Sequence, residues 1–326
     1  MPNEFILSSG DTIPAVGLGI WKIAPEDTAQ AVYDAIKIGY RHIDAACDYG
    51  NETEAGQGIG KAITDGLIKR EELWVTSKLW NTFHRPEHVR AACEKTLADL
   101  QLDYVDLYHV HFPFSLAYVA PEKRYPPGWF FDPDAAEPKM VADAVPIIDT
   151  WNAMVELQQA GLSRNIGVCN FGVSLLRDLM ASSAVAPCVM QIELHPYLTQ
   201  EKLLRFCAES KIHVTGFSPL GAQSYYSLGM ATEGEGVIDR EEIHAIAGEV
   251  NRTPAQVLMR WAVQRGTSIV PKSSRVERMK ENLSLFDFEL TEQHMATISA
   301  MDQHKRFNDP GDFGEQAFNT FFPIYE

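Results

Sequence analysis

Cysteine, positive charge and long hydrophobic runs are all scarce in this chain of 326 residues. The five cysteines are odd in number and no two stand in a Cys-x-x-Cys spacing, so we expect reduced thiols in an intracellular protein. Lysine and arginine number 28 against 44 aspartates and glutamates, and a formal charge of −16 excludes a general attraction to nucleic acid or anionic membranes. No apolar run approaches the roughly 18 residues that a membrane-spanning helix needs.

The N-terminal residues also lack a basic segment followed by an apolar core, so the sequence predicts no secretory signal and a cytoplasmic protein. The rest of the composition, 45% hydrophobic and 22% charged, is that of an ordinary globular protein. The length leaves room for one large domain or two small ones.

Short apolar segments alternate along the chain with longer segments whose apolar residues recur at helical spacing. After a hairpin at about 5–14, we expect strands near 15–20, 42–46, 73–79, 105–111, 164–169, 188–193, 213–218 and 268–271. Helices are expected near 25–38, 51–66, 86–101, 146–160, 173–182, 199–210, 254–265 and 275–284. Such strand–helix units predict a parallel sheet buried on both faces. Eight units with no linker and no convincing glycine fingerprint favour one (β/α)8 barrel domain over 1–326, rather than an open doubly wound sheet.

Two segments do not fit the repeat. Residues 112–145 are rich in proline and carry an aromatic cluster that includes Tyr125 and Trp129, and the tail from Gln303 onward looks irregular. Loops of this length usually cover or form binding sites. We therefore expect both segments at the carboxyl ends of the strands.

Two motifs suggest other chemistry and are weaker on inspection. Gly56-Gln57-Gly58-Ile59-Gly60-Lys61 resembles a phosphate loop, but it is one residue short and falls in a helical pattern, where its glycines would pack a helix on the barrel. His109 and His111 could lie on one face of a strand, as in metal-dependent barrel hydrolases, but His195 alone does not complete their ligand set. That hydrolase stays an alternative from another reaction class. No Gly-x-Ser-x-Gly supports a serine nucleophile.

Four residues at or just beyond the ends of three successive strands form the most specific pattern in the chain. Asp44 lies within an apolar run, where a carboxylate is costly without a cation, and Lys78 offers one from the next strand. Tyr49 and His111 follow neighbouring strand ends. A lysine ammonium lowers the pKa of a nearby tyrosine, so we expect Tyr49 to act as a general acid toward a carbonyl oxygen. His111 would donate an N–H to the same oxygen.

With this four-residue pattern, the chain resembles the aldo-keto reductase superfamily over nearly its whole length. The matching phrases are Gly39-Tyr40-Arg41-His42-Ile43-Asp44, Tyr49-Gly50-Asn51-Glu52, Ser77-Lys78-Leu79-Trp80, His111-Phe112-Pro113, Gly167-Val168-Cys169-Asn170-Phe171, Gln191-Ile192-Glu193 and Pro271-Lys272-Ser273. The resemblance implies that the four residues are the catalytic tetrad, with Tyr49 as the acid. It also implies a hydride from NADPH that is bound without a Rossmann domain, and no catalytic metal.

The resemblance further implies a cofactor site along the barrel mouth. Asn170 and Gln191 match the carboxamide partners, and Phe217 matches the aromatic residue that stacks on the nicotinamide. Cys169 stands where the family usually has serine, which weakens one expected contact. Ser218 and Leu220 match the loop that covers the pyrophosphate.

A basic segment after the last strand, 272–280, has four positive residues in nine within an acidic chain. Ser274 and Glu277 have capping-box spacing, so a helix is expected to begin there and to present its N-terminus to an anion. The resemblance makes this the adenosine 2′-phosphate site, and the implied contacts are Lys272, Ser273, Ser274 and Arg278, with Asn282 at the adenine. We expect NADPH to be preferred and NADH to be used less well.

Within the superfamily the likeness is closest to the xylose and aldose reductases, through Tyr125-Pro126-Pro127-Gly128 and Arg306-Phe307-Asn308-Asp309-Pro310. It implies a substrate pocket with an aromatic inner part and a polar outer part, formed by Trp21, Trp80, His111 and Phe112, and by Asp48 and Asn308. The expected substrate is a small open-chain aldose, and the expected assembly is a monomer or homodimer. An aldose-6-phosphate reductase is the alternative, although those relatives carry lysine where this chain has Gly50. A cofactor-binding protein without activity is a further alternative, against which the intact tetrad argues.

Overall fold

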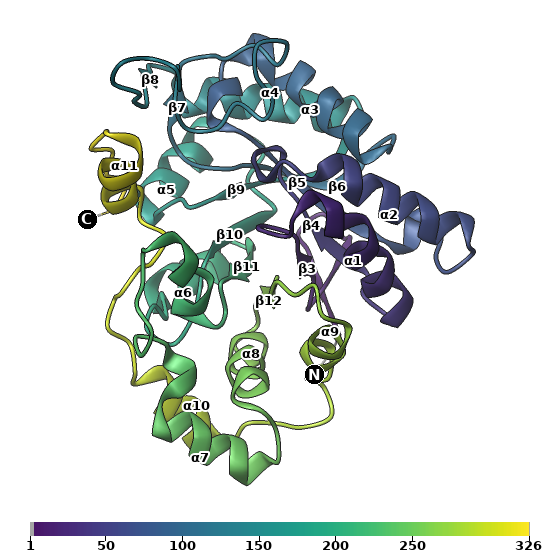
Figure 1. The fold of residues 1–326 in the computed structure, drawn as a ribbon, viewed down its shortest axis with the longest axis vertical. Helices are drawn as coiled ribbons and strands as arrows, with labels where there is room; N and C mark the ends of the chain where they lie inside the picture. The colour runs from purple at the N-terminus through teal and green to yellow at the C-terminus, as the bar shows by residue number, and fades with distance from the viewer. Residues whose placement is uncertain (1–2, 326) are drawn as a thin grey trace.

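The computed structural model of the protein describes residues 3–325. Eight parallel strands form a curved central sheet that the helices surround, as Figure 1 shows. The sheet strands are β3 (Leu18–Gly19), β4 (His42–Asp44), β5 (Trp74–Leu79), β6 (Val105–Val110), β9 (Ser163–Cys169), β10 (Val189–Glu193), β11 (His213–Phe217) and β12 (Ser268–Ile269). The helices are α1 (Pro25–Ile38), α2 (Glu52–Thr64), α3 (Pro86–Leu100), α4 (Ile147–Gln159), α5 (Val173–Ser182), α6 (Glu201–Glu209), α7 (Glu241–Val250), α8 (Pro254–Gln264), α9 (Val276–Leu283), α10 (Glu292–Ser299) and α11 (Pro310–Phe318).

The sheet closes into a barrel between its two end strands, β12 and β3. Val16 forms a parallel bridge with Ile269, and the Gly19 amide donates to the carbonyl oxygen of Pro271 at 3.1 Å. A Cβ at Gly19 would lie 2.6 Å from the carbonyl oxygen of Val270, so a larger residue would force the two strands apart. These contacts join the two edges of the eight-stranded parallel sheet, so no strand edge is left unpaired. The expected (β/α)8 barrel is therefore confirmed.

The hairpin and the phosphate-loop look-alike take the places that the sequence predicts. Strands β1 (Glu4–Ile6) and β2 (Thr12–Pro14) pair antiparallel. The residues of the look-alike lie inside helix α2. A Cβ on Gly56 would sit 2.5 Å from the carbonyl oxygen of Leu100, so this glycine allows α2 to approach the end of α3 closely. No helix among residues 3–325 is long and apolar enough to cross a bilayer.

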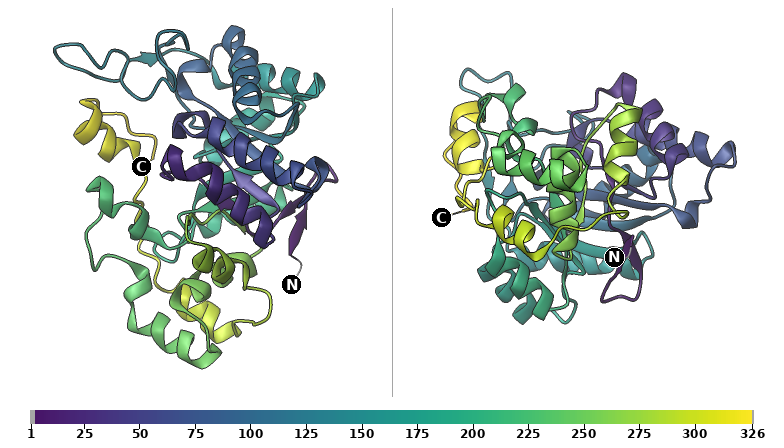
Figure 2. Two further views of the ribbon diagram at one scale, coloured as in Figure 1. Left: turned by 45° about the vertical axis from the view of Figure 1, so that its right-hand side comes forward. Right: turned by 90° about the horizontal axis from the view of Figure 1, so that it is seen from below.

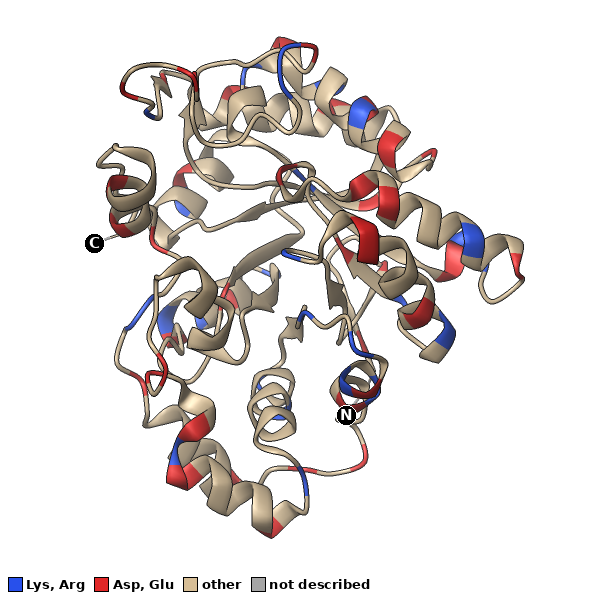
Figure 3. Ribbon diagram, viewed as in Figure 1, with Lys and Arg blue, Asp and Glu red and all other residues tan. Residues whose placement is uncertain are grey.

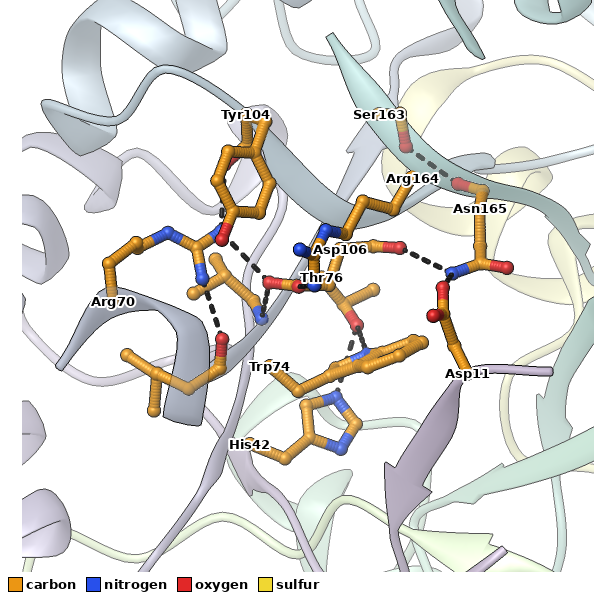
Figure 4. Close-up of polar contacts among 12 residues, drawn as sticks. Asp11, His42, Arg70, Trp74, Thr76, Tyr104, Asp106, Ser163, Arg164 and Asn165 are labelled. Carbon is orange, nitrogen blue, oxygen red and sulfur yellow. Dashed lines mark hydrogen bonds and ion pairs between the residues drawn. The ribbon is translucent and has the colours of Figure 1, made fainter. Parts of the chain in front are cut away.

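Polar residues near the amino ends of the strands tie the hairpin to the barrel, as Figure 4 shows. The side-chain amide of Asn165 in β9 donates to Asp11 in the hairpin turn at 2.7 Å. Asp106 in β6 accepts from Arg70 at 2.8 Å and from the Val75 amide at 2.9 Å. This network lies at the opposite strand ends from the tetrad, where barrel residues usually serve stability.

The tail is more ordered than its sequence indicates, because helix α11 occupies a segment that we expected to be irregular. Pro310 stands at the first helical position, and the Asp309 carboxylate accepts from the Gly311 amide at 2.8 Å. Two glycines in nine residues disfavour a helix, but Phe313 and Phe318 pack on Trp129 with ring centroids 5.2 and 5.3 Å apart. Tertiary packing therefore outweighs propensity here.

The long segment 112–145 also has a small antiparallel ladder, β7 (Ser115–Leu116) with β8 (Ala142–Asp143). Figure 2 shows the tail helix beside this long loop. The amide of Met140 donates to Thr320 at 2.9 Å, and Asn319 donates to the carbonyl oxygen of Pro138 at 2.9 Å. The two segments outside the repeat are thus packed on each other.

The capping box expected from Ser274 and Glu277 does not form. Helix α9 begins at Val276 with Arg275 as its N-terminal flanking residue, and no side chain caps it. Ser273, one residue earlier than Ser274, accepts a hydrogen bond from the Arg275 amide at 3.1 Å. The helix begins one residue later than that spacing requires, and Ser274 is exposed to solvent.

Candidate active site

The register of the sheet brings the four predicted catalytic residues to one end of the barrel. Asp44 is the last residue of β4 and Lys78 the penultimate residue of β5, while His111 directly follows β6. Tyr49 ends a short 3₁₀ turn, Cys47–Tyr49, just beyond β4. The tetrad is therefore built from three adjacent strands, as the sequence predicts.

The Lys78 ammonium is buried and uses all three of its protons. It donates to Asp44 Oδ2 at 2.9 Å, to the Ala45 carbonyl oxygen at 2.7 Å and to Tyr49 Oη at 3.2 Å. Burial disfavours its positive charge, but Asp44 and Tyr49 act in the other direction and outweigh it, so the pKa of Lys78 is raised. A buried cation thus stands within hydrogen-bonding distance of the Tyr49 phenol.

The direction of the Tyr49 pKa shift corrects the sequence-based expectation. Lys78 does lower the pKa of Tyr49, but burial raises it by more, so that the net pKa lies above the usual value for tyrosine. The free energy that a phenolate would lose by leaving water is larger than the favourable interaction it would gain with the Lys78 ammonium. Tyr49 therefore holds its proton firmly at neutral pH and can release it only to an oxygen that is gaining negative charge.

His111 lies beside Tyr49 as a neutral imidazole. The two ring centroids are 5.9 Å apart, and Trp80 packs against the imidazole at 5.3 Å. Burial, with Lys78 next, lowers the pKa of His111 well below its ordinary value. A neutral histidine has one N–H to donate, which suits a carbonyl oxygen placed near the Tyr49 hydroxyl.

Two side-chain amides flank the tetrad. Gln191 Nε2 donates to Asp44 Oδ1 at 2.8 Å, and Asn170 Nδ2 donates to the carbonyl oxygen of His111 at 2.8 Å. The Cys169 thiol is buried and its sulfur lies 4.0 Å from Gln191 Oε1, so it gives this amide only a weak partner. The amides that were expected to hold a carboxamide are thus hydrogen-bonded to two of the predicted catalytic residues, Asp44 and His111.

A cavity of about 1310 Å³ begins at the tetrad and runs along the barrel mouth to helix α9. Its lining includes Asp44, Tyr49 and His111, while Lys78 is buried behind them. The lining also contains all six predicted substrate residues and nine of the ten predicted cofactor residues, namely Trp21, Asp48, Trp80, His111, Phe112 and Asn308, with Asn170, Gln191, Phe217, Ser218, Leu220, Lys272, Ser273, Arg278 and Asn282. The tenth, Ser274, does not line it, which follows from the later start of α9.

Other lining residues were not found from the sequence. Lys22 enters the cavity from the loop after β3, with its ammonium 2.7 Å from both the Ser224 carbonyl oxygen and Ser227 Oγ. Trp129 from the long loop and Phe318 from α11 also line the cavity, with their ring centroids 5.3 Å apart. The aromatic cluster around Trp129 was a visible signal, whereas nothing in the sequence places Lys22 beside a loop 200 residues away.

Acidic residues are spread over the outer helices, and Figure 3 shows this for α1 and α7. Among residues 3–325, the lysine and arginine side chains that line the cavity are Lys22, Lys272 and Arg278. All three belong to the part of the cavity away from the tetrad, in the β3 loop and around α9. This gives an acidic protein the local reversal of charge that an anionic ligand requires.

Among the residues that the structure describes, His109 and His111 do not form a metal site with other side chains. His109 lies in β6 inside the barrel and is fully buried. Within the described range 3–325, no group of three or more His, Cys, Asp or Glu side chains could hold a metal ion.

The closed (β/α)8 barrel and the Tyr–Lys–Asp–His cluster at its carboxyl end agree with the comparison of the whole chain with known families. The aldo/keto reductase family model matches residues 15–303, and the chain belongs to this family of oxidoreductases.

Its relatives point to a narrower group. The chain is 46% identical over 326 residues to the NADPH-dependent aldose reductase GRE3 of Saccharomyces cerevisiae, covering 98% of this chain and 100% of that protein. It is 45% identical to the probable NAD(P)H-dependent D-xylose reductase xyl1 of Arthroderma otae, covering 98% and 95%. A crystal structure of a Bombyx mori aldo-keto reductase in complex with NADP superposes with a TM-score of 0.83 at 34% identity, covering 98% of each chain.

Proposed function

We propose that this protein reduces the aldehyde group of open-chain aldoses such as xylose to the alcohol, using NADPH. The observation that carries the proposal is the Tyr49 hydroxyl, 3.2 Å from the buried Lys78 ammonium in a cavity that is lined by both aromatic and polar side chains. The relatives named as NADPH-dependent aldose reductase and D-xylose reductase support both the cofactor and the substrate class.

The residues along the cavity fit NADPH. Asn170 and Gln191 would hold the carboxamide, Phe217 would stack on the nicotinamide ring, and Ser218 and Leu220 would cover the pyrophosphate. Lys272 and Arg278 would hold the 2′-phosphate, with Ser273 beside them and Asn282 at the adenine. The cofactor, when bound, supplies the hydride for the carbonyl carbon.

The chain's own residues manage the proton and the developing charge. Tyr49 and His111 donate hydrogen bonds to the carbonyl oxygen, and Tyr49 releases its proton as negative charge grows there. Lys78 stabilises the phenolate that remains, and Asp44 keeps Lys78 charged. Burial raises the pKa of Tyr49 and so makes the phenol a weaker acid, which means that proton transfer depends on the charge that grows on the carbonyl oxygen and on Lys78 beside the phenolate.

The substrate end of the cavity favours a small hydroxylated chain. Trp21, Trp80 and Phe112 provide apolar surface next to the tetrad, whereas Asp48 and Asn308 provide hydrogen-bonding groups. Polar groups in a pocket select for substrates with matching hydroxyls, because a substrate without them leaves the groups unpaired.

A sugar phosphate would need a cation at this end, and neither Lys305 nor Arg306 of the tail lines the cavity. Lys305 Nζ lies 3.4 Å from Glu235, and the Arg306 guanidinium stacks on Tyr325 at 3.5 Å from the ring centroid. Gly50 has a positive φ of 69° and provides no side chain. These contacts favour a neutral aldose over a 6-phosphate.

The deciding experiment compares steady-state NADPH consumption with xylose and with glucose 6-phosphate. We expect a higher kcat/KM for xylose. A tenfold preference for the phosphate would reject the neutral-aldose assignment, and no consumption with either sugar or with a simple aldehyde would reject the reductase function altogether.

Cofactor choice provides a second test, through Arg278 on helix α9. A charge-assisted hydrogen bond contributes about 1.5–3 kcal/mol, so Arg278→Ala should weaken NADPH binding roughly tenfold or more and leave NADH nearly unchanged. Lys280→Ala is the matched control, because Lys280 lies on the same helix but does not line the cavity. If fluorescence titration showed that Arg278→Ala weakens the binding of NADPH and NADH equally, Arg278 would not contact the 2′-phosphate.

The pH dependence of substrate binding tests the role of Asp48. Burial raises the pKa of Asp48 to about 7, so its carboxyl is neutral below that pH and ionised above it. A carboxylate accepts stronger hydrogen bonds from sugar hydroxyls than a neutral acid does, so the KM for xylose should fall severalfold as the pH rises through about 7. Asp48→Asn should remove this dependence. An unchanged profile in the variant would show that another group titrates.

A further inference from the structure

We propose that Tyr325, near the end of the chain, is a positioning residue for the nicotinamide subsite and acts through Asn170. The proposal rests on the proposed function, in which Asn170 holds the cofactor's carboxamide. Tyr325 does not line the cavity, so its effect on a ligand would be indirect.

The tail reaches this region because a buried carboxylate holds it against the barrel. Glu193, at the end of β10, is fully buried and accepts hydrogen bonds from the amides of Phe307 and Asn308 at 2.9 and 3.0 Å. His195 Nε2 lies 2.9 Å from the same carboxylate. This anchor fixes the segment just after Arg306, so the course of the tail around the site is set by β10 rather than by the tail's own sequence.

The far end of the tail then returns to the same place. The Tyr325 hydroxyl lies 3.4 Å from both the backbone oxygen and the side-chain oxygen of Asn170. The Arg306 guanidinium packs on the Tyr325 ring, 3.5 Å from its centroid. The half-buried tyrosine is thus held on one side by the anchored tail and on the other by the turn after β9.

Asn170 is a residue whose orientation needs outside support. It has a positive φ of 64°, a backbone conformation that asparagine adopts more readily than most residues other than glycine. Its terminal amide turns about a broad torsion, so hydrogen bonds decide which way the oxygen and nitrogen point. Nδ2 donates to the His111 carbonyl oxygen at 2.8 Å, and Oδ1 shares the single Tyr325 hydroxyl proton with the backbone oxygen of Asn170, each at 3.4 Å.

With these two partners the amide keeps one N–H and one oxygen lone pair for a ligand, in a single orientation. A fixed amide binds a carboxamide with less loss of conformational freedom than a mobile one. Tyr325 therefore adds to the affinity for the nicotinamide half of the cofactor and leaves the adenosine half unaffected.

Tyr325→Phe tests this, because it removes the hydroxyl and keeps the ring on which Arg306 packs. We expect about fivefold weaker binding of NADP⁺ from the loss of one neutral hydrogen bond. The binding of 2′-phospho-ADP-ribose, which has no nicotinamide, should not change. Tyr118→Phe is the matched control, since Tyr118 is an exposed tyrosine of the long loop and stacks on His88 away from the cavity.

Asn170→Ala separates this inference from the proposed function. If Tyr325 acts through Asn170, adding Tyr325→Phe to Asn170→Ala should cause no further loss of NADP⁺ affinity. Equal weakening of both ligands by Tyr325→Phe, no weakening of either, or a further loss in the double variant would each overturn the positioning role. NADP⁺ binding that is unchanged by Asn170→Ala would instead overturn the placement of the carboxamide, and the inference with it.

Discussion

Replacing Tyr49 with phenylalanine should lower kcat for aldose reduction by about 10²–10⁴-fold, the range that general acid catalysis contributes. Its hydroxyl is the one that Lys78 contacts, at 3.2 Å, and its raised pKa keeps it protonated until the substrate oxygen becomes basic. Phenylalanine retains the ring that faces His111. Single-turnover measurement of NADPH oxidation with saturating xylose would isolate this step.

The same variant should bind NADPH as tightly as the wild type. Phenylalanine removes only one oxygen, and the residues expected at the 2′-phosphate lie on and before α9, far along the cavity. Turnover within a few-fold of the wild type would remove Tyr49 from the role of acid. Loss of NADPH binding together with turnover would show that the substitution disturbs the site more widely.

Lys78→Met should be nearly as damaging to catalysis, and it should also destabilise the fold. Removing the ammonium leaves the Asp44 carboxylate, only 4% exposed, without its cation. Breaking a buried ion pair in this way typically costs about 3–5 kcal/mol. We therefore expect a clear drop in melting temperature alongside the loss of activity.

The double variant Asp44→Asn with Lys78→Met separates the two effects. It leaves no unpaired buried charge, so much of the stability should return, whereas activity should stay as low as in Lys78→Met alone. Recovery of activity with stability would mean that Lys78 serves only the fold. A further additive loss of activity would mean that Asp44 acts independently of Lys78.

The buried strands were the most predictable part of this protein. They are short and largely apolar, and Asp44 and Lys78 stand at or next to the carboxyl ends of β4 and β5. Because parallel strands place their carboxyl ends at one edge, sequence order alone brought Asp44, Lys78 and His111 together. Tyr49 followed from its position just after β4.

Helix α11 and the start of α9 were predicted wrongly, for different reasons. Helix α11 contains glycines and exists because Phe313 and Phe318 pack on Trp129, a contact between segments nearly 200 residues apart. At α9 the spacing of Ser274 and Glu277 fitted a capping box, but the helix begins at Val276, one residue later than that spacing requires. Local patterns do not fix how long a turn continues.

The sequence by itself determined the barrel, the tetrad and the basic segment near α9, because each depends on residue type and strand order. Only the tertiary structure decided the direction of the Tyr49 pKa shift, since burial and the distance to Lys78 oppose each other and neither is written in the chain. It also decided that Lys22 lies at the cavity, that the tail forms a helix there, and that Tyr325 meets Asn170. These contacts join segments far apart in sequence, so they exist only once the barrel has closed and given the tail a surface on which to pack.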